Sequence, residues 1–421
     1  MLRGRKPSIR ALTAGPGVVG PLAAAAAFAG VCLLVVLILT NRPVNWRTVD
    51  LQVYRAGAWA LLHGRDVYAA HPQHSHLPFT YPPFAALSFV PMALLGPVGA
   101  RVALTALSAI ALVVCLGLSI RAVRPGWTAR SRWTIALVVA AAALFTDPVY
   151  WTLSYGQVNL LLMALVLLDL FGRRTVLPRG VLIGLATAVK LTPGIFIVYL
   201  ALTRRWRAAV IAGAVVLASM ATGYLVAPGP SLEYWGRLVF EPRRVGGLMF
   251  AGNQSLRGVV ARLSGDTGAG SVWMLSALVT LAVGMWLAAR AHRHRAELLG
   301  VSLCAVTGLL VSPVSWNHHW VWVLPVAVVL WARCLDLRAP GRLAVAAGWT
   351  AVFYLAPIWW VPNRSGLEYT QHGVQLLAGN AYVLTALVLL ACAPLLIRRA
   401  TPPPRRPAEP AVPAALQNAV R

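Results

Sequence analysis

Long apolar runs separated by short basic segments constrain the fold of this chain more than any single motif does. Several runs approach the roughly 20 residues that cross a bilayer as a helix, and they lack the alternating period of barrel strands. Hydrophobic residues make up 59% of the 421-residue chain, and the mean hydropathy is +0.70. The sequence therefore predicts an all-α polytopic membrane protein. The runs lie at about 18–40, 84–96, 98–120, 133–146, 158–171, 180–203, 208–226, 273–289, 297–312, 319–335, 341–358 and 379–397.

The charge distribution indicates a membrane role for the basic residues. The chain has 37 basic and 11 acidic residues, for a net charge of +26, and only two of the basic residues are lysines. Binding of nucleic acid needs a basic face with aromatic platforms on a soluble domain, whereas these arginines stand between apolar runs. We therefore expect membrane lipids as partners and no nucleic acid. The five cysteines show no paired spacing, so neither a disulfide framework nor a zinc site follows from them.

The basic residues also predict the topology. Residues 1–18 are basic and precede the first run, which favours a cytoplasmic N-terminus and an uncleaved first helix. Residues 19–397 then form one membrane domain, and the proline-rich tail 398–421 is expected to be cytoplasmic and disordered. The expected extracytoplasmic loops are 41–82, 227–272, 313–318 and 359–378.

Two arrangements of the first half satisfy these patterns. If every run crosses the membrane, the chain has about twelve helices, but the arginine-containing loops 121–132 and 173–179 then lie outside. If runs 84–96 and 180–203 are hairpins that enter and return, those arginines stay inside. The two arrangements differ over the side of segment 147–159.

The first outer loop concentrates the polar chemistry of the chain. Its segment Asp50–Pro83 contains carboxylates, histidines, arginines and tyrosines in an otherwise apolar protein. Apolar residues at helical spacing predict an amphipathic helix over Leu51–His63, ended by Gly64. Asp50 follows the first membrane run, where partial desolvation would raise its pKa towards the range of a general base. It is our candidate catalytic residue, with a structural cap of the following helix as the alternative.

Three other groups are candidates. Lys190 lies at membrane depth before a helix break, and charge there is costly and marks a functional site. The motif SPVSWNHHW carries His318 and His319, which point in different directions from a helix, so that one of them beside Trp316 or Trp320 could hold a sugar or a phosphate. Interfacial tryptophans with polar neighbours are the alternative, which these residues alone slightly favour. The amides in YGQVN are expected chiefly to cap helices. The segment HPQHSH has no standard zinc spacing, and we expect no metal site and no cofactor.

Several ordered segments together resemble one family. They are DLQVYRAGAWALLHGRDVYA, LPFTYPPFAAL, SYGQVNLLLMAL, GLATAVKLTP, AGNQSLRG and SPVSWNHHW, within about residues 20–397. They are similar to the actinobacterial polyprenyl-phosphate-mannose-dependent α-1,2-mannosyltransferases of the GT-C class. The resemblance implies a GT-C-type bundle of about 12 transmembrane helices with a large first outer loop that carries a catalytic aspartate, matched here by Asp50. It also favours the twelve-crossing arrangement.

The resemblance implies a reaction and roles for residues. Mannose would move with inversion from polyprenyl-phosphate-mannose to a mannosylated lipid, on the extracytoplasmic face of a bacterial plasma membrane. Asp50 would take the proton of the acceptor 2-hydroxyl. Stabilisation of the leaving phosphate would come from the set Arg55, Lys190, His318 and His319, and sugar binding from the set Tyr54, Trp59, Tyr81, Trp316, Asn253 and Gln254.

Two alternatives remain at the level of sequence. A related GT-C transferase could use another lipid-linked sugar, such as arabinose or glucose. A transporter or lipid flippase would explain the helices and Lys190, but it should show repeated halves, and none is apparent. The sequence does not choose among phosphatidylinositol mannoside, lipomannan and lipoarabinomannan as the acceptor.

Overall fold

The structure, a computed structural model, describes residues 20–40, 48–72, 75–173, 176–265, 270–337, 340–363 and 366–398. The N-terminal segment 1–18 and nearly all of the tail 398–421, for which we made predictions, lie outside these residues. The described chain is helical throughout, with one isolated β-bridge between Asn253 and Trp316. The α-helices are α1 (Pro21–Thr40), α2 (Val49–Leu62), α3 (Pro83–Ser88), α4 (Val90–Leu94), α5 (Gly96–Val123), α6 (Ala129–Ala143), α7 (Asp147–Tyr155), α8 (Asn159–Phe171), α9 (Val181–Val189), α10 (Ile195–Leu202), α11 (Trp206–Val226), α12 (Pro228–Gly236), α13 (Leu256–Ser264), α14 (Gly270–Arg293), α15 (Glu297–Val311), α16 (Val323–Leu337), α17 (Pro340–Leu355), α18 (Val374–Gly379) and α19 (Ala381–Arg398). Short 3₁₀ helices are η3 (Thr192–Gly194), η4 (Leu238–Phe240), η5 (Pro242–Val245), η6 (Asn317–Trp322), η7 (Pro357–Trp359) and η8 (Leu367–Thr370).

The described helices confirm an all-α polytopic membrane protein. Five are long and apolar enough to cross a bilayer, and a sixth span results if α6 and α7, which meet at a 78° bend, are taken together. Several shorter apolar helices of 10–17 residues accompany them. The number of twelve crossings therefore stays a prediction. The five spans are Gly96–Val123, Trp206–Val226, Gly270–Arg293, Asn317–Asp336 and Pro340–Trp359.

Two apolar runs are broken where the sequence left two arrangements open. Run 84–96 forms the short helices α3 and α4 in place of one continuous helix. Run 180–203 divides into α9 and α10, and Lys190 occupies the break with extended backbone (φ −147°, ψ 128°) before the 3₁₀ turn at Pro193. Such breaks place polar backbone and side chains inside the helical body, where a ligand can use them.

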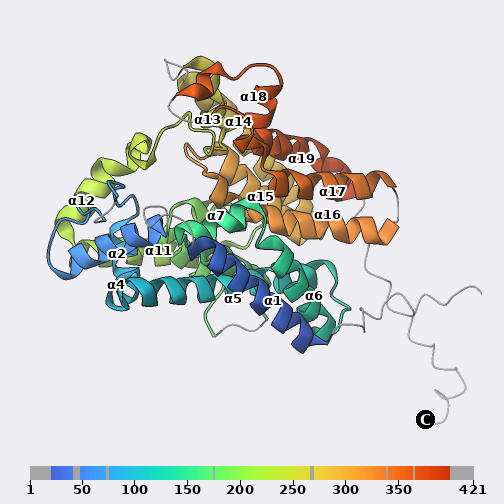
Figure 1. The fold of residues 1–421 in the computed structure, drawn as a ribbon, viewed down its shortest axis with the longest axis horizontal. Helices are drawn as coiled ribbons and strands as arrows, with labels where there is room; N and C mark the ends of the chain where they lie inside the picture. The colour runs from blue at the N-terminus through green and yellow to red at the C-terminus, as the bar shows by residue number, and fades with distance from the viewer. Residues whose placement is uncertain are drawn as a thin grey trace, which may run out of the picture.

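The polar segment that follows the first apolar run packs onto this body through α2. The predicted amphipathic helix is confirmed as Val49–Leu62, and Gly64 beyond its end has φ +61°. Its buried residues pack against α3 and α4, and Figure 1 shows α2 and α4 at the left of the molecule. The helix thereby brings Asp50, its second residue, against the junction of α7 and α8.

One buried carboxylate joins four elements near the site. Asp147, at the bend between α6 and α7, accepts hydrogen bonds from Asn317 Nδ2 (2.9 Å), Trp359 Nε1 (2.7 Å) and Tyr382 OH (2.8 Å). These donors come from η6, η7 and α19. Because unpaired buried polar groups are costly, all four groups gain from keeping this arrangement, which holds η6 and its histidines against α7.

Candidate active site

The carboxylate of Asp50 lies half-buried at the N-terminal end of α2. Its Oδ2 accepts a 2.8 Å hydrogen bond from Nε2 of Gln157. Burial raises the pKa of Asp50 from 3.8 to about 6, although the Gln157 bond and the positive charge of Lys190 partly oppose that rise. At neutral pH the group is thus mostly ionised and yet more basic than an ordinary aspartate, which suits a general base.

Gln157 is buried at the junction of α7 and α8, and its orientation is set by tyrosines. Its Oε1 accepts hydrogen bonds from Tyr54 OH at 2.7 Å and from Tyr81 OH at 3.5 Å, while the two hydroxyls lie 3.0 Å apart. Because an amide oxygen can only accept, these bonds turn the amide NH₂ towards Asp50. Gln157 therefore positions the carboxylate.

Gly156 permits the close approach of α2. It ends α7 with φ +69°, a left-handed conformation that glycine adopts without steric cost. A Cβ at this position would lie 2.8 Å from Cβ of Leu51 and 3.3 Å from Cβ of Thr48. The Thr48 N–H donates to the carbonyl of Ser154 at 2.9 Å. The glycine and this bond together seat the start of α2 beside Gln157.

A cation faces the same region from the break between α9 and α10. Lys190 Nζ donates to Asn159 Oδ1 and lies 3.1 Å from both this oxygen and Nε2 of His319. It also stands 5.7 Å from the ring centroid of Tyr81. The ammonium has three N–H donors, of which these contacts use two. The remaining donor and the charge are suited to an anionic group of a ligand.

The two adjacent histidines diverge, as the sequence predicted. Their rings are 4.7 Å apart and inclined at 89°. His319 reaches Lys190, whereas His318 is buried against Tyr155, with ring centroids 5.3 Å apart. The carbonyl of His318 accepts hydrogen bonds from Asn159 Nδ2 and from Thr152 Oγ1, at 2.8 and 2.9 Å. His319 thus joins the polar cluster directly, while His318 anchors η6.

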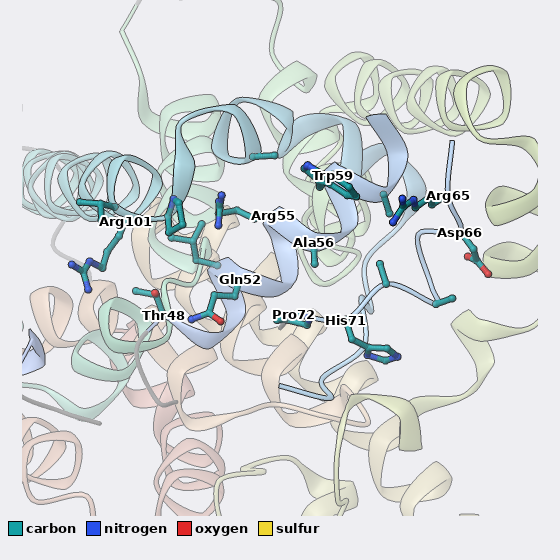
Figure 2. Close-up of a pocket in the computed structure, with 17 residues that line it drawn as sticks. Thr48, Gln52, Arg55, Ala56, Trp59, Arg65, Asp66, His71, Pro72 and Arg101 are labelled. Carbon is teal, nitrogen blue, oxygen red and sulfur yellow. The ribbon is translucent and has the colours of Figure 1, made fainter. Parts of the chain in front are cut away.

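Arg55 and Trp59, both predicted to act in the reaction, lie away from Asp50. At about 3.6 residues per turn, five and nine positions beyond Asp50 correspond to other faces of the same helix. Arg55 Nε donates to the carbonyl of Met92 at 3.0 Å, and Trp59 stacks on His63 at the surface. The structure therefore places both residues on the opposite side of α2, in a separate pocket (Figure 2).

The amides of Asn253 and Gln254 are fully buried in the loop that precedes α13. Asn253 Nδ2 donates to the carbonyl of Leu248, and Gln254 Nε2 donates to the carbonyls of Ala251 and Gly379. These bonds hold the loop together and do not bring either amide to Asp50. The indole of Trp316 packs in the same region, against Gly246 and Phe250.

The tyrosines Tyr54 and Tyr81 do lie beside Asp50, but as buried groups. Tyr54 has no exposed surface, and its ring stacks on Phe89. Its hydroxyl is engaged with Tyr81 and Gln157. In this state the two rings support the amide of Gln157 and present no open face to a sugar.

The geometry also identifies residues that sequence reasoning undervalued. Gln157 and Asn159 touch Asp50 and Lys190 respectively, although helix capping had been the favoured role for the amides of YGQVN. A signal was available: two amides beside a glycine, at the start of an apolar run, are expensive to bury without partners. Together, a basic carboxylate and a cation on facing elements can deprotonate a hydroxyl and stabilise a departing anion.

Comparison with known proteins agrees with this chemistry. The family model described as Glycosyltransferase family 87 matches residues 79–313. The chain is 35% identical over 377 residues to the polyprenol-phosphate-mannose-dependent alpha-(1-2)-phosphatidylinositol mannoside mannosyltransferase of Mycolicibacterium smegmatis, across 82% of this chain and 85% of the relative. The chain belongs to glycosyltransferase family 87. It is thus a glycosyltransferase with several membrane helices.

Other relatives of this family 87 chain carry similar names. The Mycobacterium tuberculosis enzyme with the same description is 35% identical over 384 residues, across 85% of this chain and 87% of the relative. A Mycobacterium tuberculosis polyprenol-phosphate-mannose-dependent alpha-(1-2)-phosphatidylinositol pentamannoside mannosyltransferase is 37% identical over 317 residues, across 74% of this chain and 72% of the relative. No solved structure matches the chain significantly. The family segment includes Gln157, Asn159 and Lys190 but ends before His318 and His319.

Proposed function

We propose that this chain is an inverting mannosyltransferase that transfers mannose from polyprenyl-phosphate-mannose to a mannosylated lipid and forms an α-1,2 linkage. The acceptor would be a phosphatidylinositol mannoside, lipomannan or lipoarabinomannan. The observation that carries the proposal is the pairing of a half-buried Asp50, held by Gln157, with the charge of Lys190 on a facing element. The names of the relatives supply the donor and the acceptor class.

In the proposed step, the 2-hydroxyl oxygen of the acceptor mannose attacks the anomeric carbon of the donor. The new carbon–oxygen bond forms as the bond from that carbon to the phosphate oxygen breaks, with inversion from a β- to an α-linkage. Asp50 takes the hydroxyl proton, and the bonding electrons leave with polyprenyl phosphate. The pKa of about 6 lets Asp50 act as the acceptor of this proton near neutral pH.

The leaving phosphate gains negative charge as its bond to the sugar breaks. Lys190 is the strongest candidate to stabilise that charge, because its hydrogen-bond partners are the neutral acceptors Asn159 and His319. A narrow cavity of about 40 Å³ borders these three residues, and apart from Thr192 the rest of its lining is apolar, including Phe196 and Trp322. A cation beside apolar side chains suits a phosphate attached to an isoprenoid chain, and the cavity has to widen to admit one. Arg55 has no part in this step, since it lies on the far side of α2.

The site is proposed to face the extracytoplasmic side of the plasma membrane. The support comes from arginine clusters at 290–295, 333–342 and 398–406, which are cytoplasmic when the loop 227–272 is outside. The first loop, with Asp50, then lies outside as well. A labelling reagent that does not cross the membrane should modify a cysteine introduced at exposed Asp66 in intact cells.

The function is tested by radiolabel transfer in membranes that contain the protein. Label from polyprenyl-phosphate-mannose should enter a phosphatidylinositol mannoside, and the product should be cleaved by an α-1,2-mannosidase. Transfer from a lipid-linked arabinose, with none from the mannose donor, would establish the related transferase instead. Lipid analysis of a strain lacking the protein should show which acceptor accumulates.

A further inference from the structure

A large pocket lies on the side of α2 that faces away from Asp50. Its volume is about 880 Å³, and it is bounded by α2, the loop that follows it, and the start of α5. Arg55 and Trp59 line it from one face of α2, Thr48 lines it from the position before the helix, and Asp50 is not among its lining residues. The pocket is therefore separate from the proton-transfer site, although both adjoin one helix.

Three arginines give this pocket a positive charge. Arg55 comes from α2, Arg65 from the following loop, and Arg101 from the second turn of α5. Figure 2 shows Arg55 between Arg101 on one side and Arg65 on the other. One acid, Asp66, also lines the pocket, and its Oδ1 accepts a hydrogen bond from the backbone N–H of Tyr68. The described lining thus carries a net positive charge.

The contacts of these arginines leave donors available. Arg55 uses Nε for the Met92 carbonyl, and among the described residues its two terminal nitrogens have no protein partner. Arg65 lies over the ring of Trp59, 5.1 Å from the centroid, and it is exposed. Guanidinium groups bind phosphate through paired N–H donors. The cluster therefore suits a phosphate ester better than a neutral sugar.

The pocket borders a surface that is suited to lipid chains. Leu94, Leu95, Val98 and Val102, at the end of α4 and the start of α5, are all more than half exposed. Helix α5 is one of the five candidate spans, so its exposed Val98 and Val102 are suited to contact lipid, with Leu94 and Leu95 beside them. A lipid whose phosphate is bound by the arginines could thus place its acyl chains against these apolar side chains. Its polar headgroup would then point towards the loop that follows α2.

We propose that this arginine pocket binds the phosphodiester of the acceptor glycolipid, on the opposite side of α2 from the reacting sugar. The inference rests on the proposed function. The donor phosphate is assigned to Lys190, so the arginine pocket provides a second phosphate site for the second lipid substrate. A helix is about 10 Å across, so the acceptor headgroup passes the N-terminal end of α2, at Thr48, before its terminal mannose meets Asp50.

Binding of water-soluble probes to the purified full-length protein tests this proposal without turnover. Isothermal titration compares a deacylated glycerophosphoinositol mannoside with a methyl mannoside of the same glycan, and with inorganic phosphate. We expect the phosphodiester to bind at least about tenfold more tightly than the phosphate-free glycan. Arg101→Gln and Arg65→Gln should each weaken binding of the phosphodiester by about that factor. Exposed Arg130→Gln, on α6, is the control and should bind as the wild type does.

The outcomes separate this proposal from the proposed reaction. Equal affinity for the two glycans, or retention of the difference in both arginine variants, would overturn the arginine pocket. Binding of inorganic phosphate alone would also overturn it, because the site would then lack glycan recognition. Asp50→Asn should bind the phosphodiester as the wild type does. In transfer assays with vesicles of phosphatidylinositol mannoside, the arginine variants should raise the KM for the acceptor and leave the KM for the donor unchanged, which also shows that they are folded.

Discussion

The side-chain amide of Gln157 donates a 2.8 Å hydrogen bond to the carboxylate of Asp50, across 107 positions of the sequence. The same amide accepts hydrogen bonds from Tyr54 and Tyr81 through its oxygen. The two buried tyrosines therefore fix the orientation of Gln157, and Gln157 fixes the position of the proposed base. The reaction depends on this connection, because a carboxylate displaced from the attacking hydroxyl cannot take its proton.

Replacing Asp50 with Asn should abolish transfer while the protein still folds. An amide of the same shape can keep the Gln157 contact but cannot accept the proton, so we expect kcat to fall by about 10²–10⁴-fold. Radiolabel transfer in membranes measures the effect, with protein amounts matched by immunoblot. Turnover close to that of the wild type would remove Asp50 as the base.

The same substitution should raise thermal stability. The pKa of Asp50 is higher in the folded protein than its ordinary value, so the folded state favours the protonated form. The ionised Asp50 therefore lowers the free energy of unfolding. This loss of stability grows as the pH rises from about 4 and is complete above about 6, and a neutral Asn removes it. We expect the Tm of Asp50→Asn to exceed that of the wild type at pH 7.5 but not at pH 4. An equal or lower Tm at pH 7.5 would contradict the assigned burial of the charge.

Replacing Gln157 with Leu should move the acid limb of the pH profile to higher pH. The Gln157 bond stabilises the carboxylate and lowers the pKa of Asp50, so its loss raises that pKa further above 6. Loss of positioning lowers kcat/KM at every pH, and for a shift of about one pKa unit the ratio of kcat/KM at pH 6 to that at pH 8 also falls roughly fivefold. A variant profile that is reduced equally at every pH would show that Gln157 does not lower the pKa of Asp50.

Replacing Lys190 with Met should lower kcat with a smaller change in the KM for the acceptor. The ammonium is assigned to charge that grows on the departing phosphate, and loss of one such donor typically costs about 10²–10³-fold. Lys190→Arg keeps the charge and should retain part of the activity. Steady-state kinetics on purified protein check both variants, and full kcat in the Met variant would exclude Lys190 from the step.

Replacing Gly156 with Ala should impair both transfer and stability. The new Cβ would lie 2.8 Å from Cβ of Leu51, so the start of α2 must shift. The alanine would also have to adopt φ +69°, which is strained for a residue with a side chain. Overpacking of this kind costs about 1–3 kcal/mol. Gly213→Ala, on α11, is the matched control because its Cβ meets nothing within 4 Å. Similar activity and Tm in the two variants would show that the approach of α2 tolerates a side chain.

Much of the site followed from local sequence. Asp50 after the first apolar run, Lys190 before Pro193, and the histidines of SPVSWNHHW each stood out because charge or polarity is costly at a membrane face. The helix that carries Asp50 was predicted from the spacing of its apolar residues and is confirmed as Val49–Leu62. The assignment of Arg55 and Trp59 to the same site neglected that spacing, since the helical period already turns both away from Asp50.

The sequence by itself determined that the chain is an all-α membrane protein and that an unusual aspartate follows its first apolar run, because apolar length and exposed charge are local properties. Only the tertiary structure decided that Gln157 orients that aspartate, that Lys190 faces it with Asn159 and His319, and that three arginines form a second pocket behind α2. These contacts join segments far apart in the chain. They depend on how helices pack and on the close approach that Gly156 permits, and neither is encoded by the spacing of residues within one segment.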